Sequence, residues 1–249
     1  MIVAARTDVG RVREVNEDTY CCRDLPGALL VAVADGIGGH RAGAVASQLA
    51  VDEVCRAVAG AYSPGVDAAG LLPDAVKQAN RAILQAAGAD GECESMGTTL
   101  TVALVQGNSI CIAHVGDSRA YLIQGDEVSQ LTHDHSLVGE LYRNGSLTEA
   151  EAMSHPHKHI LFRALGADEM AEVDLLRVAW APGDFLVLCS DGLSNLVEAS
   201  ELRAIISRYP PHQAVDRLVA LANERGGQDN ITVIVVENRL SGERREYGA

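Results

Sequence analysis

Four aspartates stand at the borders of the most apolar stretches of the sequence. Asp35, Asp117 and Asp191 each follow such a stretch and precede a glycine or a serine, while Asp229 comes shortly before one. Aspartate is common at strand ends because it favours turns, and that explanation suffices for any single position. Four such borders, two of them followed by a glycine that permits close approach, favour a shared site instead.

A cluster of these carboxylates would need a counter-charge. Two carboxylates about 4 Å apart repel by roughly 4 kcal/mol at an effective dielectric constant of 20, so several together would rival the stability of a whole domain. Protonation or a bound cation must relieve this repulsion. An all-oxygen set favours Mg²⁺ or Mn²⁺ over zinc. More than four carboxylates indicate two ions, an arrangement that activates water and holds a phosphoryl group.

A further acidic pair, Glu17 and Asp18, stands at the opening of the second predicted strand. Apolar or alternating runs bounded by turn residues predict strands over 2–5, 29–34, 98–105, 109–115, 120–124, 185–189 and 231–236. Helical spacing predicts helices over 42–60, 67–88, 200–208 and 212–224, and TEAE at 148–151 predicts the start of a short helix. Strands and helices occur in blocks, which favours one layered α+β domain.

Composition narrows the classes of function. The formal net charge of −14 over 249 residues disfavours nucleic acid and anionic membranes, so neither is expected as a partner. The uncharged stretch 96–116 could span a bilayer in length, but Gly and Asn in its middle predict a hairpin. Charges interrupt any signal peptide, and none of the six cysteines forms a C-x-x-C pair. We therefore expect a reduced, cytoplasmic protein.

Several other catalytic signatures are absent from the sequence. No cysteine is followed six positions later by arginine, as a cysteine-nucleophile phosphatase loop would need, and no G-x-S-x-G elbow occurs. Neither lysine lies in a Walker loop, and there is no H-E-x-x-H. The glycine-rich DGIGGHRAG is similar to a nucleotide-binding loop, but Arg41 occupies the position of the third glycine, which disfavours that function. The acidic set remains as the strongest chemical signal.

Eight motifs between residues 11 and 236 carry a family resemblance. In chain order they are RVREVNEDTY, VAVADGIGGHRAG, MGTTLTVALV, AHVGDSRAYL, LTHDHSLV, RALG, LVLCSDGLSNLV and GGQDNITVIVV. Together they resemble the metal-dependent Ser/Thr protein phosphatase family (PPM, type 2C), especially its compact bacterial members. The resemblance implies a four-layer α-β-β-α sandwich, with two mostly antiparallel sheets flanked by helices, over residues 1–238. Residues 239–249 would form a polar, frayed tail.

The resemblance also implies an activity, which is hydrolysis of phosphoserine and phosphothreonine in proteins. A hydroxide that bridges two Mn²⁺ or Mg²⁺ ions would attack phosphorus in line. Asp35 would bridge the ions and the Gly36 carbonyl would bind one of them. Asp191 and Asp229 would ligate the other, with Asp18 in the inner or the water-mediated shell.

Other site residues follow from the same motifs. Asp117 matches the position that, together with Asp191, supports a third metal ion in bacterial members. Glu17 would hold metal-bound water, and Asn230, beside Asp229, would be a supporting residue. Arg13 would contact the substrate phosphate, since a guanidinium fork suits that dianion. Arg13, Asp35 and Asp191 are thus the expected catalytic residues, and the expected partners of this monomer are phosphorylated proteins and a cognate Ser/Thr kinase.

The chain departs from the family pattern at two positions. Many eukaryotic members have a histidine, thought to be the general acid, where this chain has Ile37. The nearest alternative is His40, or metal-bound water could serve instead. Eukaryotic members also often carry an aspartate where this chain has Asn195, which weakens the third metal site without removing it. Residues 137–163 match the variable flap near the active site.

The other prominent histidines are not expected to take part in catalysis or metal binding. The histidines at 155, 157 and 159 are expected in an exposed loop rather than at zinc, and His114 is expected to be a buried hydrogen-bonding residue. Two other functions remain open. One is a catalytically silent, metal-binding pseudophosphatase that acts as an interaction module, and the other is a different two-metal hydrolase such as a nuclease. The intact acidic set and Arg13 disfavour the first, and the negative charge disfavours the second.

Overall fold

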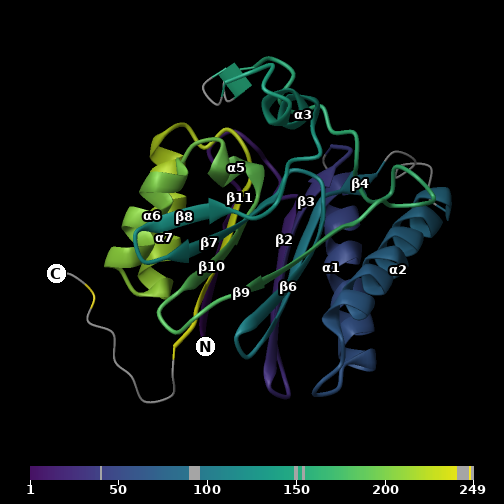
Figure 1. Cartoon of the computed structure of the whole chain (residues 1–249). Coiled ribbons are helices and arrows are strands. Elements are labelled where there is room, and N and C mark those ends of the chain that lie inside the picture. The colour runs from purple at the N-terminus through teal and green to yellow at the C-terminus, as the bar shows by residue number, and fades with distance from the viewer. Residues whose placement is uncertain (40, 90–95, 149–150, 153–154, 240–246, 248–249) are drawn as a thin grey trace.

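The first of two sheets lies on the side of the chain termini in Figure 1. The computed structural model describes residues 1–39, 41–89, 96–148, 151–152, 155–239 and 247. The strands of this sheet run in the spatial order β1 (Ile2–Asp8), β11 (Ile231–Glu237), β10 (Phe185–Cys189), β7 (Arg119–Gln124) and β8 (Glu127–Gln130). Its pairings are antiparallel, and β10 and β11 are buried along their whole length.

The second sheet packs face to face against the first. Its strands run in the order β2 (Asp18–Leu25), β3 (Ala28–Ile37), β5 (Leu100–Gln106), β6 (Ser109–Val115) and β9 (Asp174–Ala179). The short strand β4 (Gly97–Thr98) pairs with the end of β3. These pairings are also antiparallel. The turn between β5 and β6 confirms that residues 96–116 form a hairpin and not a membrane span.

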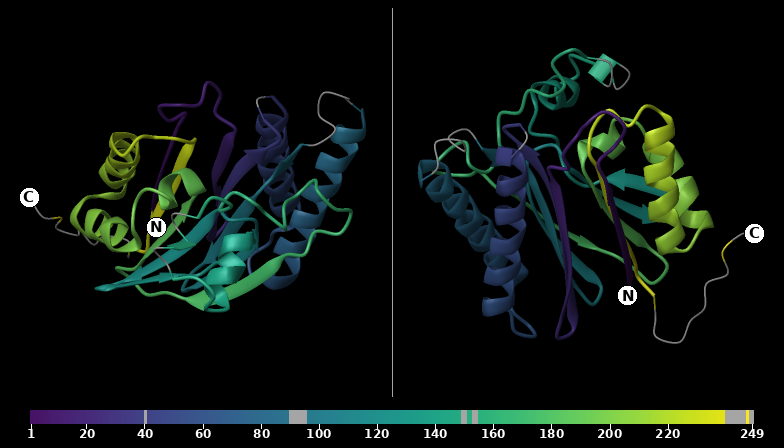
Figure 2. Two further views of the ribbon diagram at one scale, coloured as in Figure 1. Left: turned by 90° about the horizontal axis from the view of Figure 1, so that it is seen from above. Right: turned by 180° about the vertical axis from the view of Figure 1, so that it is seen from behind.

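Helices cover the outer face of each sheet, as both views in Figure 2 show. The second sheet is covered by α1 (Arg41–Ala61) and α2 (Ala68–Ala89), and the first by α6 (Ala199–Arg208) and α7 (Pro211–Glu224). The short helices α3 (Leu137–Arg143) and α5 (Asp191–Ser194) lie at the upper edge of the sandwich (Figure 1). This arrangement confirms the predicted four-layer α-β-β-α fold.

Three hydrophobic clusters separate the four layers. One lies under α1 and α2, one lies under α6 and α7, and the third fills the space between the sheets with residues such as Ile112, Leu186 and Ile234. Alternation along the strands decides which cluster a side chain joins, because successive residues point to opposite faces. Strands that are buried on both faces therefore read as continuous apolar runs.

Those continuous runs explain which elements were predictable. The seven predicted strand ranges and the four longer helices correspond to observed elements within a few residues. A strand opens at Asp18, as predicted, but the predicted ranges omit residues 18–25, β8 and β9. These strands lie at or near sheet edges and carry polar or charged residues on one side, so their apolar pattern is weak. The short helices α3 and α5 were also missed.

Parts of two further predictions fall on described residues. Thr148 and Glu151 exchange hydrogen bonds, with the Thr148 N–H donating to Glu151 Oε2 over 2.8 Å, as the predicted capping box requires. The predicted tail 239–249 lies mostly outside the described residues, apart from Arg239 and Tyr247, which both hydrogen-bond Glu237. Within the described part of the chain, no helix is long and apolar enough to cross a bilayer.

We predict that Leu186→Ala lowers the free energy of unfolding by about 2–5 kcal/mol, because it removes a side chain from the centre of the core between the sheets. Urea denaturation in EDTA would measure the change. The matched control is Leu175→Ala, whose side chain is 42% exposed and should cost less than about 1 kcal/mol. Equal losses in the two variants would contradict the placement of Leu186 in the core.

Candidate active site

Two of the predicted site residues face each other across neighbouring strands. In the register of β2 and β3, Asp18 is the direct partner of Asp35. Side chains opposite each other in an antiparallel pair have Cβ atoms about 4.5–5.5 Å apart, and like charges there are destabilising. The pairing of the two strands therefore brings two carboxylates side by side at the end of the sheet.

The other aspartates converge on this pair. Burial raises the pKa of Asp35 well above its ordinary value, and the charges of further carboxylates raise it more. In order of effect, these are Asp18, Asp191, Asp117 and Asp229. The carboxyl of Asp35 is therefore close enough to all four other aspartates for their charges to act on it.

The pKa values of three further aspartates, Asp18, Asp117 and Asp191, are raised as well. Burial raises the pKa of Asp18 to about 7, although hydrogen bonds to Thr232 and Ser190 act the other way. Burial also raises the pKa of Asp117, to which the charge of Asp191 adds. The cluster therefore retains protons at pH values where an isolated aspartate would have lost them.

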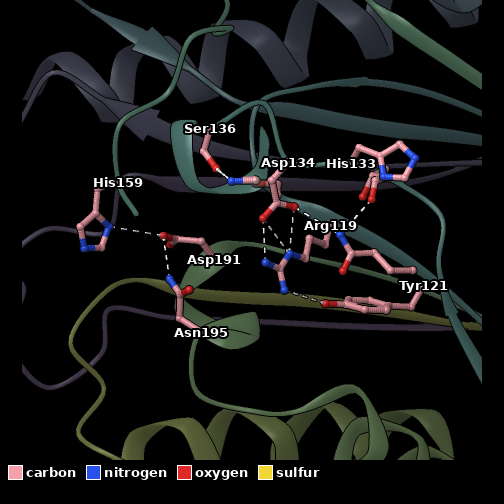
Figure 3. Close-up of polar contacts among 12 residues, drawn as sticks. Arg119, Tyr121, His133, Asp134, Ser136, His159, Asp191 and Asn195 are labelled. Atoms are coloured by element: carbon pink, nitrogen blue, oxygen red, sulfur yellow. Dashed lines mark hydrogen bonds and ion pairs between the residues drawn. The ribbon is translucent and has the colours of Figure 1, made fainter. Parts of the chain in front are cut away.

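Individual hydrogen bonds hold three of the carboxylates. Ser190 Oγ donates to Asp18 Oδ2 over 2.7 Å, and Arg13 Nη2 donates to Asp229 Oδ2 over 2.9 Å. Figure 3 shows the third contact, in which Asn195 Nδ2 donates to Asp191 Oδ2 over 3.0 Å. Asn195, noted in the sequence only as a missing aspartate, thus orients the carboxylate one helical turn before it. No sequence pattern pointed to Ser190.

The cluster is not a closed cage. Within the described residues, no three Asp, Glu, His or Cys side chains are grouped so that they could hold a metal ion as they stand. Two buried oxygen atoms, Asp18 Oδ1 and Asp191 Oδ1, have no hydrogen-bond partner. Buried carboxylate oxygens without a hydrogen-bond partner lower the stability of the fold. Such oxygens are suitable ligands for hard divalent cations. The all-oxygen donor set therefore suits Mg²⁺ or Mn²⁺. The side chains are, however, farther apart than the ligands in a complete coordination shell.

Thr98 and Thr99 fix the backbone of Asp35. The Asp35 N–H donates to Thr99 Oγ1 and the Thr99 N–H donates to the Asp35 carbonyl, both over 2.9 Å. Thr98 Oγ1 also donates to that carbonyl, over 2.8 Å. Thr99 Oγ1 lies 2.7 Å from Ser118 Oγ, in the loop that carries Asp117. One threonine therefore couples the centre of the cluster to the loop of a second aspartate.

Close backbone contacts explain two of the glycines in the motifs. A Cβ atom on Gly36 would collide with the Gly43 carbonyl at the start of α1. Gly116 has φ +108°, and a Cβ there would lie 2.6 Å from the Thr99 side chain. Only glycine adopts the second conformation without strain and fits the space at both positions. The Gly36 N–H donates to the Glu17 carbonyl over 3.2 Å, so these expected site residues are neighbours.

Asn230 holds the loop that precedes β2. Its Oδ1 accepts from the Glu17 N–H over 2.8 Å, and its Nδ2 donates to the carbonyls of Val9 and Val15, each over 3.0 Å. The side chain is buried and uses both ends of its amide, as a rigid cross-link between β11 and residues 9–17. The loop so fixed carries Arg13. This position fits the supporting role expected for Asn230.

One histidine of the predicted flap, which was expected only to lie in an exposed loop, is close to the acidic cluster. His159 Nδ1 lies 3.9 Å from Asp191 Oδ2 (Figure 3). The predicted exposed loop is present, since His157 and His159 are exposed and His155 is half-buried, but its contact with Asp191 depends on how the flap folds back. Ile37 is 37% exposed and has no proton to transfer, and His40 lies outside the described residues.

His114 is the buried histidine that the sequence predicted. It is fully buried, and its ring nitrogens lie 2.9 Å from Thr101 Oγ1 and 3.1 Å from the His133 carbonyl. Burial lowers the pKa of His114 to about 4, so the ring is neutral near pH 7. The residue is a structural support behind the site.

A cavity of about 420 Å³ opens next to the cluster. Asp117 and Asp191 lie on its lining, together with Tyr142 and Lys158 of the predicted flap. Arg119 forms part of the same lining and donates to both oxygens of Asp134, with its shortest contact at 2.7 Å (Figure 3). The cavity is large enough for side chains of a second polypeptide.

Comparisons with known proteins agree with this geometry. Residues 10–232 match the family model described as protein phosphatase 2C. The Ser/Thr phosphatase stp of Listeria innocua is 42% identical over 97% of this chain and 97% of its own. The crystal structure of the Mycobacterium tuberculosis Ser/Thr phosphatase PstP/Ppp superposes with a TM-score of 0.86 at 40% identity, covering 96% of this chain and 99% of that one. A structure of the PstP catalytic domain with two manganese ions has a TM-score of 0.84 at 38% identity, over 95% and 97%.

The chain therefore belongs to the protein phosphatase 2C family, as its motifs predicted. The match to the Listeria phosphatase extends over nearly the whole length of both chains. Its enzymatic class is that of a Ser/Thr protein phosphatase.

The raised pKa values predict how stability depends on pH. An aspartate with a raised folded pKa binds its proton more tightly in the folded than in the unfolded protein, so its contribution is lost as the pH rises through the folded value, about 7 for Asp18. In EDTA, the free energy of unfolding should fall between about pH 5 and pH 8. Urea denaturation at several pH values would measure this slope.

The isosteric variant Asp18→Asn is the control for that slope. It should be more stable than the parent protein at about pH 8 in EDTA and should show a shallower pH dependence, because one repelling charge is gone. A parent protein whose stability in EDTA rises over the same range would contradict a cluster that retains its protons.

We predict that Thr99→Val loosens Asp35 without removing it. The variant leaves the buried Asp35 N–H without its acceptor, which should cost about 1–3 kcal/mol of stability, and it should weaken Mn²⁺ binding about tenfold in calorimetric titration. Thr101→Val is the matched control, because Thr101 is equally buried but bonds His114 and the Ser118 carbonyl instead. Equal Mn²⁺ affinities in the two variants would show that Thr99 does not position Asp35 for a metal.

Proposed function

We propose that the acidic cluster is the catalytic centre of this phosphatase and that it works with two divalent cations, Mn²⁺ or Mg²⁺. The observation that carries the proposal is the direct pairing of Asp18 with Asp35 across β2 and β3, beside the buried and unpartnered Oδ1 atoms of Asp18 and Asp191. Bound cations would compensate such a concentration of charge. The solved PstP catalytic domain with two manganese ions supports this assignment.

The residues would divide between the ions as the family pattern suggests. Asp35 would contact both ions, the Gly36 carbonyl would bind one of them, and Asp18 would lie in the inner or the water-mediated shell. Asp191 and Asp229 would hold the second ion, and Asp117 with Asp191 would provide a place for a third. Bound there, the cations would supply Lewis-acid charge to the phosphoryl oxygens and would lower the pKa of water.

The chain itself orients the substrate and keeps the carboxylates in place. Arg13 is 46% exposed in its side chain and pairs with Asp229 at the surface. Exposed ion pairs are weak, so its guanidinium can turn to a phosphate dianion, which it binds through two parallel N–H groups. Ser190 and Asn195 meanwhile hold Asp18 and Asp191 toward the cluster.

The substrates would be phosphorylated proteins, modified by a cognate Ser/Thr kinase whose action this enzyme reverses. The segment that flanks the phosphorylated residue would enter the cavity lined by Asp117, Asp191 and the flap. The described cysteines are free thiols, which supports a reducing, cytoplasmic location. We propose that the enzyme acts there as a monomer.

The test is release of phosphate from a phosphothreonine peptide in Mn²⁺, in Mg²⁺ and in EDTA. We expect metal-dependent release that EDTA abolishes. Asp35→Asn should lower kcat by at least about a thousandfold and weaken Mn²⁺ binding, because it removes the carboxylate shared by the cluster. Arg13→Ala should lower kcat/KM by about 10- to 100-fold through the lost phosphate contact.

Arg203→Ala serves as the matched control for Arg13, because Arg203 pairs with Asp126 far from the cluster. It should leave kcat/KM unchanged. Absence of release in every condition, from protein shown to be folded, would favour the silent interaction module. Near-normal turnover of Asp35→Asn would overturn the assignment of the centre.

A further inference from the structure

The contact between β2 and α1 brings two cysteines together. Side chains on one face of β2 point to the helix, since Thr19 Oγ1 lies 2.9 Å from Ser47 Oγ and Arg23 Nη1 donates to the Cys55 carbonyl over 3.4 Å. Cys21 lies between these two residues on the same face. Cys22, next in sequence, points to the opposite face and is exposed.

The two sulfur atoms are in direct contact. Cys55 Sγ lies 2.7 Å from Cys21 Sγ, and both thiols are free. A disulfide bond is about 2.05 Å long and strains the backbone when the two cysteines are not already aligned. Here the side chains converge, so an approach of less than about 1 Å would bring the atoms to bonding distance.

The two thiols differ in a way that suits successive reactions. Cys21 is half-buried and lies near the Arg23 guanidinium, whereas Cys55 is only 8% exposed. The hydrogen bond from the Cys55 thiol lowers the pKa of Cys21, and the charge of Arg23 acts in the same direction. The same hydrogen bond raises the pKa of Cys55. Cys21 is therefore the more accessible and more acidic of the two thiols, and Cys55 is the sheltered partner.

We propose that Cys21 and Cys55 form a modification site, at which a low-molecular-weight disulfide such as oxidised glutathione converts the pair into a protein disulfide. The Cys21 thiolate attacks one sulfur of the reagent, whose S–S bond breaks and releases one thiolate that takes up a proton. Cys55 then gives up its proton and attacks Cys21 Sγ, which expels the second thiolate. The protein loses two hydrogen atoms, and the reagent is reduced to two thiols.

The bond would tie an edge strand to the helix layer that covers it. In its sheet, β2 has β3 as its neighbour on one side only, and it begins at Asp18. The chain segment enclosed by the disulfide contains β3 with Asp35 and the first two thirds of α1. Cross-linking this segment restricts the unfolded chain, so the oxidised protein should resist unfolding more strongly than the reduced one.

The experiment follows thiols and mass, and it requires no phosphatase activity. The full-length protein would be treated with oxidised glutathione, alkylated and digested with trypsin. We expect an intact mass lower by about 2 Da, two fewer titratable thiols than the six of the reduced chain, and a linked pair of the peptides 14–23 and 42–56. The melting temperature should rise by about 5 °C on oxidation.

Single variants identify the sulfur atoms. Cys22→Ser is the matched control, because peptide 14–23 contains both Cys21 and Cys22, and this variant should keep the cross-link and the shift in melting temperature. Cys21→Ser and Cys55→Ser should lose both. If Cys55→Ser does not fold, Cys21→Ser, at a more exposed position, still provides the test.

Three results would overturn the proposal. One is a glutathione adduct that persists on Cys21 while Cys55 remains open to alkylation. Another is a cross-link that survives in Cys21→Ser. The third is no loss of thiols at all, or a cross-linked protein that melts at a lower temperature than the reduced one, since the bond would then form only by distortion.

Discussion

Repulsion between the carboxylates of Asp18 and Asp35 is the constraint around which the site is built. The two residues are direct partners across β2 and β3, and neither can move away without breaking the register of this strand pair. Burial raises the pKa of both, and the neighbouring aspartates add to the effect. The protein therefore holds a concentrated negative charge that only protons or cations can balance.

The surrounding fold keeps this unfavourable arrangement from relaxing. Thr99 binds both backbone groups of Asp35, and Asn230 ties the loop before Asp18 to β11. These supports come from the ends of buried strands, whose own stability lies in the three apolar clusters. The packing of the strands thus holds the carboxylates in an arrangement that destabilises the fold but suits the binding of divalent cations.

A second set of contacts joins the acidic cluster to the flap and to the cavity beside it. His159 of the flap and Asn195 of α5 meet at Asp191, which also borders the cavity. Arg13 meets Asp229 from the opposite loop. In the proposed mechanism, cation binding, the position of the flap and substrate entry all involve the same two carboxylates.

The sequence by itself determined the family, the layered fold, the buried strands and the identity of the clustered aspartates. The strands and the aspartates at their ends are readable because they depend on local signals, namely apolar runs buried on both faces. The family and the four-layer fold followed from the resemblance of eight ordered motifs to a known family. The sequence did not reveal the edge strands β8 and β9, whose apolar pattern is weak, or the short helix that begins at Asp191.

Only the tertiary structure decided that Asp18 faces Asp35, that Ser190 and Asn195 hold the carboxylates, and that His159 reaches Asp191. The contact between Cys21 and Cys55 is likewise visible only in the tertiary structure. Each of these depends on the register of a strand pair or on the packing of a loop or helix against a sheet. Such contacts join residues far apart in the chain, and no local spacing in the sequence encodes them.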